Sequence, residues 1–280
     1  MNWPSPPRTH LATLRRKLAV AAVTVLTALV VAAVPAASAG ASQSGAPKPT
    51  IVLVHGAFAD ASGWNEVVER LQRSGYTAYA PANPLRGLAS DAAYIRSFLS
   101  TVRGPIVLVG HSYGGAVITN AATGNPNVKA LVYVAAYGLD QGESVAAANS
   151  LGGGHTDLTE HLVVRPFPGS GDQNGDAYVD PAEFPRIFAA DLPRQEAEVL
   201  AAAQRPGVLS SLLEPSGVPA WKKIPSWYLV ASNDNLIPPV AERTMAARMH
   251  ATTVEIASSH VAMMSHPADV VRLIRAAAGR

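Results

Sequence analysis

The fold of this 280-residue chain is decided by the stretch Ile106-Val107-Leu108-Val109-Gly110-His111-Ser112-Tyr113-Gly114-Gly115. An apolar run leads into a G-x-S-x-G motif, and a helix-forming segment follows it. Between a strand and a helix this motif is a nucleophile elbow, a turn so tight that its serine stands above the sheet edge. The two motif glycines suit a strained turn in which backbone segments approach closely. The motif predicts that Ser112 is a catalytic nucleophile; the alternative is a Gly-rich turn carrying an exposed serine.

Apolar strand patterns alternate with helical patterns on both sides of the elbow. Strands are expected at residues 50–54, 77–80, 106–109, 128–134, 227–231 and 252–256, and helices at 63–74, from 90, after 112, at 239–249 and at 267–278. This alternation predicts βαβ units, right-handed crossovers and a largely parallel sheet. From about residue 139 to 220 the strand signals stop, and helical pieces such as 193–204 remain. We therefore predict an α/β domain, residues 40–280, with a mainly helical cap inserted there.

Residues 1–39 have the composition of an export signal. Arg15-Arg16-Lys17 precede an apolar stretch from Leu18 to Val34, and small residues follow up to Ala39. A basic segment, an apolar segment and an A-x-A-type site predict a signal peptide cleaved near Ala39. The alternative is an uncleaved membrane anchor, but the apolar stretch is short for a bilayer span, which favours the signal peptide. The expected product is secreted, without stable membrane association, and either the general or the twin-arginine route remains open.

Charge and cysteine content exclude several classes of function. Residues 1–39 hold four of the 22 basic residues and no acidic one, which leaves 18 basic against 20 acidic side chains. No basic patch for nucleic acid is therefore expected. The chain has no cysteine, which excludes a cysteine nucleophile and thiolate metal sites. A domain of this size can be stable without disulfides.

A serine nucleophile needs a base, and the base needs an acid that orients it. Asp234 follows the expected strand 227–231, and His260 follows the expected strand 252–256. Ligands and catalytic groups gather at the carboxyl ends of strands in open α/β sheets. Ser112, Asp234 and His260 also come in the chain order Ser, acid, His that such hydrolases use. These three residues are the predicted catalytic set.

Other side chains of the right chemistry lie near these positions. His266 precedes a proline and suits the start of a helix, and His111 is inside the elbow itself. Asp140 and Glu143 follow the expected strand 128–134 and are the alternative acids. His55 precedes a glycine and is interpreted as a hydrogen-bonding prop for its loop.

An oxyanion needs hydrogen-bond donors from the backbone. The N–H of Tyr113, directly after the candidate nucleophile, is the first expected donor. The second is the N–H of Ala57 in the loop after the strand 50–54, with Phe58 as the runner-up. A substrate pocket lined by apolar cap side chains is also expected. Its candidate residues are Phe58, Phe167, Phe184, Phe188 and Trp221.

Together these motifs resemble the α/β-hydrolase superfamily, most of all its compact esterase branch of methyl esterases, hydroxynitrile lyases and related bacterial esterases. The resemblance is carried by His55-Gly56-Ala57-Phe58 with Trp64, by the elbow, by Ser232-Asn233-Asp234 with Ile237-Pro238-Pro239, and by Ser259-His260. It covers residues 50–138 and 222–280. It implies Ser112 as nucleophile, Asp234 as acid, His260 as base and no cofactor. It also implies an α/β-hydrolase sheet of about six strands, without the family's two leading strands, and a cap after the sixth-strand equivalent.

A second motif lies inside the expected cap. Residues 172–183 match most of a calcium-binding loop, with ligand positions at Asp172, Asn174, Asp176, Tyr178 (backbone), Asp180 and Glu183. Ala177 stands where such loops require glycine, and Pro166 and Pro168 precede the loop in place of an entering helix. Calcium binding and an acidic loop of Asp and Asn turns are both open interpretations.

We expect a secreted serine hydrolase that cleaves a small-molecule carboxylic ester through an acyl-enzyme intermediate. Two alternatives remain: lyase, lactonase, C–C hydrolase or cofactor-free peroxidase chemistry on the same residues, and a non-catalytic binding protein of this fold. Lys222 and Lys223 are the nearest candidates for the base-supplying lysine that the resemblance associates with lyases. A membrane-tethered structural protein would rest on the leader alone. The sequence specifies neither the substrate nor the oligomeric state.

Overall fold

The computed structural model describes residues 47–171 and 174–279. The predicted signal segment, residues 1–39, lies outside the described residues. A central sheet has the strand order β2-β1-β3-β4-β8-β9, and all neighbouring strands are parallel. Its strands are β1 (Thr50–Val54), β2 (Ala78–Tyr79), β3 (Ile106–Ser112), β4 (Val128–Ala136), β8 (Ser226–Ala231) and β9 (Thr252–Ile256). The six-stranded parallel sheet expected from the sequence is confirmed.

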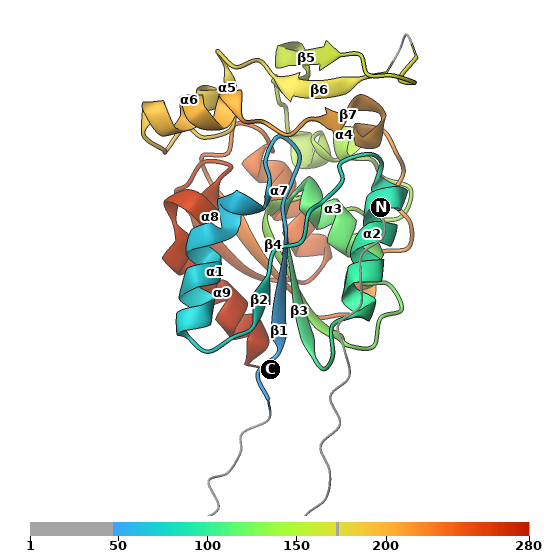
Figure 1. Cartoon of the computed structure of the whole chain (residues 1–280), viewed down its shortest axis with the longest axis vertical. Coiled ribbons are helices and arrows are strands. Elements are labelled where there is room, and N and C mark those ends of the chain that lie inside the picture. Colours follow the sequence, from blue (N-terminus) through green and yellow to red (C-terminus); the bar gives the residue numbers. More distant parts are fainter. Residues whose placement is uncertain (1–46, 172–173, 280) are drawn as a thin grey trace, which may run out of the picture. The chain divides into compact units, whose positions relative to one another are not determined.

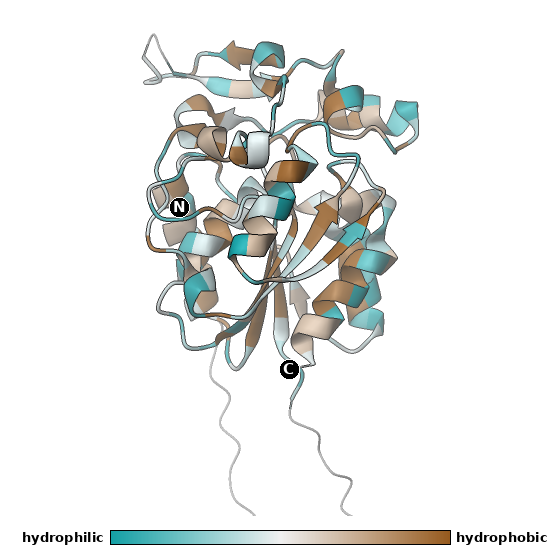
Figure 2. Ribbon diagram, turned by 180° about the vertical axis from the view of Figure 1, so that it is seen from behind, coloured by the Kyte–Doolittle hydropathy of each residue, from teal (hydrophilic) through white to brown (hydrophobic). Residues whose placement is uncertain are grey.

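The inner strands owe their place to their apolar runs. β1, β3, β4 and β8 are almost wholly buried because helices cover both of their faces. β9, at one edge, is mostly exposed and carries Thr252, Thr253 and Glu255. Polar and charged side chains on an edge strand oppose pairing with another chain. Figure 2 shows the same arrangement, with hydrophobic residues along the inner strands and hydrophilic residues on the outer surfaces of the helices.

Helices form two layers around the sheet (Figure 1). One layer contains α1, α8 and α9, which pack on one another, and the other contains α2 and α3. α7 packs against β8. The helices of this part of the chain are η1 (Ala61–Trp64), α1 (Asn65–Arg73), α2 (Leu88–Ser100), α3 (Tyr113–Ala121), α7 (Pro239–Arg248), α8 (Ala262–Ser265) and α9 (Pro267–Ala278). None of the helices in the described ranges is long and apolar enough to cross a membrane.

A cap, residues 137–225, connects β4 to β8. It contains α4 (Val145–Ala148), η2 (Leu151–Gly153), η3 (Leu158–His161), β5 (Leu162–Arg165), β6 (Asp176–Val179), α5 (Phe184–Ile187), α6 (Arg194–Ala202), β7 (Gly207–Val208), η4 (Leu209–Leu212) and η5 (Ala220–Lys222). β5, β6 and β7 form a small antiparallel sheet, seen at the top of Figure 1. The cap is mainly helical, as expected, but these three strands were not predicted. The strands are short: β5 has only three consecutive apolar residues, β6 begins with an acid, and β7 has two residues.

Candidate active site

Ser112 occupies a strained turn between β3 and α3. Its backbone has φ 52° and ψ −126°, which a residue with a side chain rarely adopts. A Cβ added to Gly110 would lie 2.6 Å from the carbonyl oxygen of Gly114, and one added to Gly114 would lie 2.4 Å from that of Val54. Both glycines are therefore required for the turn to close. The surrounding structure imposes the strain, as is usual where a side chain must be presented for chemistry.

The loop after β1 lies directly against this turn. A Cβ on Gly56 would lie 2.6 Å from the Cβ and 3.2 Å from the Oγ of Ser112. The next residues, Ala57 and Phe58, are the two expected sources of an oxyanion donor, and both are buried. Tyr113 is the first residue of α3, so its N–H has no acceptor within the helix. The backbone groups expected to form an oxyanion hole thus belong to segments that meet at Ser112.

His55 supports the loop after β1, as expected. Its Nε2 accepts the N–H of Asn83 at 2.9 Å, which leaves its Nδ1–H to donate to the carbonyl oxygen of Gly56 at 2.9 Å. The amide of Asn83 donates in return to the carbonyl oxygen of His55. Burial lowers the pKa of His55, which favours the neutral ring that these bonds require. The side chain is fully engaged in holding the loop.

Asp234 and His260 form a buried pair at the carboxyl ends of β8 and β9. Nδ1 of His260 lies 2.6 Å from Oδ2 of Asp234, and neither side chain is exposed to solvent. The other carboxylate oxygen, Oδ1, accepts the N–H groups of Leu236 at 2.7 Å and Ile237 at 2.9 Å. These donors stabilise the ionised carboxylate and fix its orientation. Nε2 of His260 is buried and has no hydrogen-bond partner among the described residues, so the imidazole nitrogen needed for proton transfer is free to act.

His111 links the elbow to the His260 loop. Its Nε2 donates to the carbonyl oxygen of His260 at 2.9 Å, and the two ring centroids are 4.6 Å apart. Burial, and secondarily His260, lowers its pKa well below the usual value, so the ring is neutral. His111 precedes Ser112 in the chain and contacts His260 directly. It therefore connects the candidate nucleophile to the candidate base.

The alternative acids and bases have other partners. Asp140 pairs with Lys222 at 2.5 Å, and Glu143 pairs with Arg248 at 2.6 Å. His266 lies 2.9 Å from the hydroxyl of Ser265 through its Nδ1. Lys222, one of the two lysines considered as a lyase base, is therefore engaged in an ion pair. These contacts favour Asp234 as the acid and His260 as the base.

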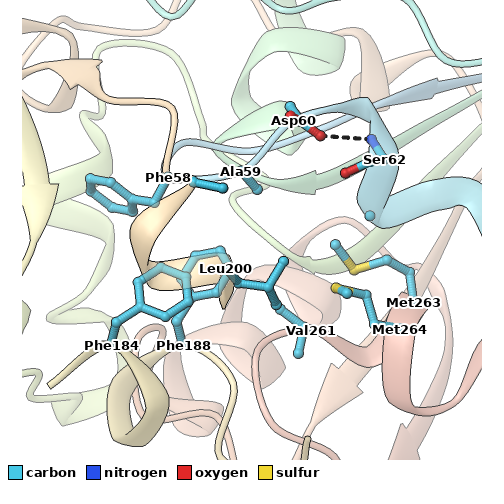
Figure 3. Close-up of a pocket in the computed structure, with 12 residues that line it drawn as sticks. Phe58, Ala59, Asp60, Ser62, Phe184, Phe188, Leu200, Val261, Met263 and Met264 are labelled. Atoms are coloured by element: carbon cyan, nitrogen blue, oxygen red, sulfur yellow. Dashed lines mark hydrogen bonds between the residues drawn. The ribbon is translucent and has the colours of Figure 1, made fainter. Parts of the chain in front are cut away.

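A small cavity of about 50 Å³ lies between the cap and the loop after β1, and its lining includes Phe188 and Val261, which adjoin His260. Figure 3 shows Phe184, Phe188 and Leu200 of the cap facing Phe58 and Ala59. The ring of Phe188 packs edge-on against His260, with centroids 5.0 Å apart. The complete lining consists of Phe58, Ala59, Asp60, Ser62, Gly63, Phe184, Phe188, Leu200, Ala203, Val261, Met263 and Met264.

Two of the five expected pocket residues do not line this cavity. Phe167 lies under the guanidinium of Arg86, with the charge 5.5 Å from the ring centroid. Trp221 donates its Nε1–H to the carbonyl oxygen of Leu139 at 2.8 Å. Aromatic residues in the cap look alike in sequence, and only the packing separates those near His260 from those elsewhere.

The described residues of the calcium motif do not converge on one point. Asp176 begins β6 and pairs with Arg86 at 2.7 Å, and Asn174 donates to Ser210. Asp180 accepts the N–H of Ala182, and Glu183 pairs with Arg186. Asp172 lies outside the described residues. Within residues 47–171 and 174–279, no group of three or more His, Asp and Glu side chains is placed to hold a metal ion. Residues 176–179 form the extended strand β6 instead of a loop, and an extended backbone does not bring these carboxylates together.

Two acidic residues near the site carry no recognisable signal in the sequence. Asp191, in the cap, accepts both the N–H of Ser259 at 2.9 Å and its hydroxyl at 2.5 Å, directly before His260. Glu242, in α7, is completely buried next to Asp234. An acid in a loop or in the first turn of a helix is usually solvated, so only tertiary packing reveals these two.

Comparisons with known proteins agree with this architecture. The model of the alpha/beta hydrolase family matches residues 51–273. Alpha/beta hydrolase nvfD of Aspergillus novofumigatus (strain IBT 16806) is 25% identical over 253 residues, which cover 83% of this chain and 97% of that protein.

Two solved structures share the fold. A pyrethroid hydrolase from Sphingobium faniae JZ-2 superposes with a TM-score of 0.67 at 23% identity, over 82% of this chain and 97% of the other. A methylesterase from Arabidopsis gives 0.68 at 19% identity, over 83% and 100%. The family match spans nearly the whole described region, and it agrees with the elbow at Ser112 and the parallel sheet. The chain belongs to the alpha/beta hydrolase family.

Proposed function

We propose that this protein hydrolyses small-molecule carboxylic esters with Ser112 as nucleophile, His260 as base and Asp234 as the orienting acid. The observation that carries the proposal is the buried hydrogen bond between Asp234 and His260, with Nε2 of His260 free of hydrogen bonds to any residue that the structure describes. A protein that only binds a ligand has no need of such a pair next to a strained serine turn. The name of one similar protein supports the same reaction class: a carbendazim hydrolyzing esterase of Nocardioides sp. (strain SG-4G) is 29% identical over 143 residues, which cover 42% of this chain and 59% of that protein.

The reaction follows from the roles of these groups. Oγ of Ser112 attacks the ester carbonyl carbon while Nε2 of His260 takes the hydroxyl proton. The N–H groups of Ala57 and Tyr113 stabilise the oxyanion, and Asp234 stabilises the imidazolium. His260 returns its proton to the departing alcohol, which leaves the acyl group on Ser112. A water molecule, deprotonated by His260, then attacks the acyl-enzyme and releases the carboxylic acid.

The cavity supports a preference for a short aliphatic group on the ester. A volume of about 50 Å³ has room for roughly three or four water-sized groups. Its walls are mostly apolar, and Phe188 connects it to His260. A two- or three-carbon group fits such a space, whereas a long acyl chain requires the cap to move.

Labelling with a fluorophosphonate tests the proposed nucleophile without knowledge of the natural substrate. We expect one equivalent of label on Ser112, identified by peptide mass spectrometry, and no label in Ser112→Ala. Label on another residue would overturn the assignment of the nucleophile. An unlabelled, folded wild-type protein would favour a non-catalytic binding protein.

We also propose that the protein is exported and that its leader is removed near Ala39. The basic and apolar composition of residues 1–39 supports this. Expression in a bacterial host with both export routes and N-terminal sequencing of the protein from the medium would test it. A mature N-terminus close to residue 40 is expected; an intact leader in the membrane fraction would contradict export.

A further inference from the structure

The triad acid has a second carboxyl group beside it, which the proposed reaction does not use. Glu242 lies in the first turns of α7 and is 0% exposed. Its Oε2 accepts the N–H of Ala231, the last residue of β8, at 3.0 Å. Its other oxygen, Oε1, is buried and has no hydrogen-bond partner within residues 47–171 and 174–279. Asp234 follows Ala231 by three residues, so both carboxyl groups lie at the same end of β8.

Among the described residues, positive charge has little influence on Glu242: that of Arg243 lowers its pKa, but less than burial and Asp234 raise it. Tyr228 of β8 and Tyr137 after β4 face the two acids, and burial raises the pKa of both phenols, so they remain neutral. Arg243, the next residue of α7, is directed to Glu255 of β9 at 2.6 Å. Two ionised carboxylates in one buried site without a cation would be strongly unfavourable.

The protonation states of the two acids can be assigned from their partners. Asp234 has three donors, namely His260 and the N–H groups of Leu236 and Ile237, and these favour its ionised form. Glu242 has one donor. Burial, and secondarily the charge of Asp234, raises the pKa of Glu242 well above its usual value. The proton of the pair therefore resides on Glu242.

A count of acceptor sites leads to the same arrangement. A carboxylate accepts about four hydrogen bonds, and Asp234 uses three of these sites within the described structure. A protonated Glu242 has one O–H to donate, and its Oε1 has no other partner. The O–H of a protonated Glu242 would thus lack an acceptor, and the neighbouring carboxylate of Asp234 has one acceptor site left.

We propose that Glu242 is held as a neutral carboxylic acid whose O–H donates to the carboxylate of Asp234. Glu242 is then a positioning residue. Its hydrogen bond holds the carboxylate of Asp234 in the orientation in which that carboxylate also accepts from His260. Because Glu242 is neutral, the two acids together carry a charge of −1. The inference rests on the proposed function for its effect on catalysis, but the hydrogen bond itself does not depend on that function.

Two substitutions separate this role from a simple packing role. In Glu242→Leu the shape is approximately kept and the donor is lost, so we expect kcat to fall about tenfold with little change in KM, as for loss of a hydrogen bond to a charged group. Glu242→Gln restores a neutral donor to Asp234 and an acceptor for the N–H of Ala231. We therefore expect it to recover most of the lost kcat and to keep the acid limb of the pH profile in place. Thermal unfolding of each variant reports whether the fold is intact.

Infrared spectroscopy gives a readout that needs no enzymatic activity. At neutral pH the difference spectrum between wild type and Glu242→Gln should contain the C=O stretching band of a protonated carboxylic acid. Absence of this band would overturn the proposal. An acid limb shifted to lower pH in Glu242→Gln would also overturn it, because that shift requires removal of a negative charge near His260. If wild type hydrolyses no ester but shows the band, the proposed function fails and the Glu242–Asp234 bond stands.

Discussion

Nδ1 of His260 lies 2.6 Å from Oδ2 of Asp234, and both side chains are completely shielded from solvent. In such surroundings a hydrogen bond between an acid and an imidazole is stronger than it would be in water. The bond fixes the ring tautomer, with the proton on Nδ1 and the lone pair on Nε2. The proposed chemistry at Ser112 depends on that lone pair.

Asp234→Asn therefore should inactivate the protein without unfolding it. The amide keeps the volume but favours the wrong imidazole tautomer, so we expect kcat for an activated ester to fall on the order of 10⁴-fold. Asp140→Asn is the matched control, because Asp140 is engaged with Lys222 on the surface. If the Asp140 variant loses activity and the Asp234 variant keeps it, the assignment of the acid is wrong.

The cavity next to Phe188 predicts selectivity by chain length. Rates with p-nitrophenyl esters from acetate to octanoate, and with methyl to hexyl esters of one acid, should fall steeply with length in one of the two series. Leu200→Ala removes a wall of the cavity, so in that series the optimum should move to longer groups. An unchanged length profile in the Leu200 variant would show that the short group binds elsewhere.

Asp191 should hold the His260 loop in place from the cap. Its carboxylate accepts two hydrogen bonds from Ser259, so Asp191→Ala leaves a buried N–H and hydroxyl unpaired. We expect kcat to fall about tenfold, since the loss of bonds to a charged acceptor displaces the residue next to the base. Asp157→Asn, which affects the ion pair with Arg186 elsewhere in the cap, serves as the control. Equal activities of the two variants would show that Asp191 does not position the loop that carries His260.

His55 predicts a loss of stability in weakly acidic solution. Burial lowers its pKa in the folded protein, whereas in the unfolded chain the pKa is close to 6.5. As the pH falls below about 6.5, the unfolded state binds the proton first, and the free energy of unfolding falls by up to about 1.4 kcal/mol per pH unit. The neutral His111 acts in the same direction. Above pH 6.5 the full stability is present.

Denaturant titrations from pH 8 to pH 5 would measure this effect. His55→Gln keeps an acceptor for the N–H of Asn83 but does not titrate, so its stability should decline less with falling pH than that of wild type. His155→Gln, which changes an exposed histidine, should follow wild type. Parallel curves for wild type and His55→Gln would show that His55 is not the titrating group.

Much of the central fold follows from the sequence alone. β1 and β9 coincide with the ranges 50–54 and 252–256 expected from it, and α9 coincides with 267–278. Long apolar runs and prolines at helix starts are local signals, and they suffice for buried strands and for helix boundaries. The antiparallel strands of the cap were not predicted because β5 is followed by a segment rich in proline and glycine, and β6 begins with an acid.

In the candidate site, only the residues that belong to sequence motifs were predictable. Ser112, Asp234 and His260 follow strands, and the order of the strands brings their loops together. Asp191 and Glu242 have no motif, and the burial that gives them a role results from the cap and from α7 packing on β8. Phe167 and Trp221 lie away from the cavity beside Phe188 for the same reason, since composition does not specify which face of the cap a ring occupies.

The most direct test of the central claim is the hydrolysis of p-nitrophenyl acetate by purified wild type and by Ser112→Ala, with folding checked by thermal unfolding. Measurable turnover by wild type that falls by about 10⁴-fold or more in Ser112→Ala is the predicted result. Turnover that persists in a folded Ser112→Ala would contradict the account, because it would require a nucleophile other than the serine of the elbow.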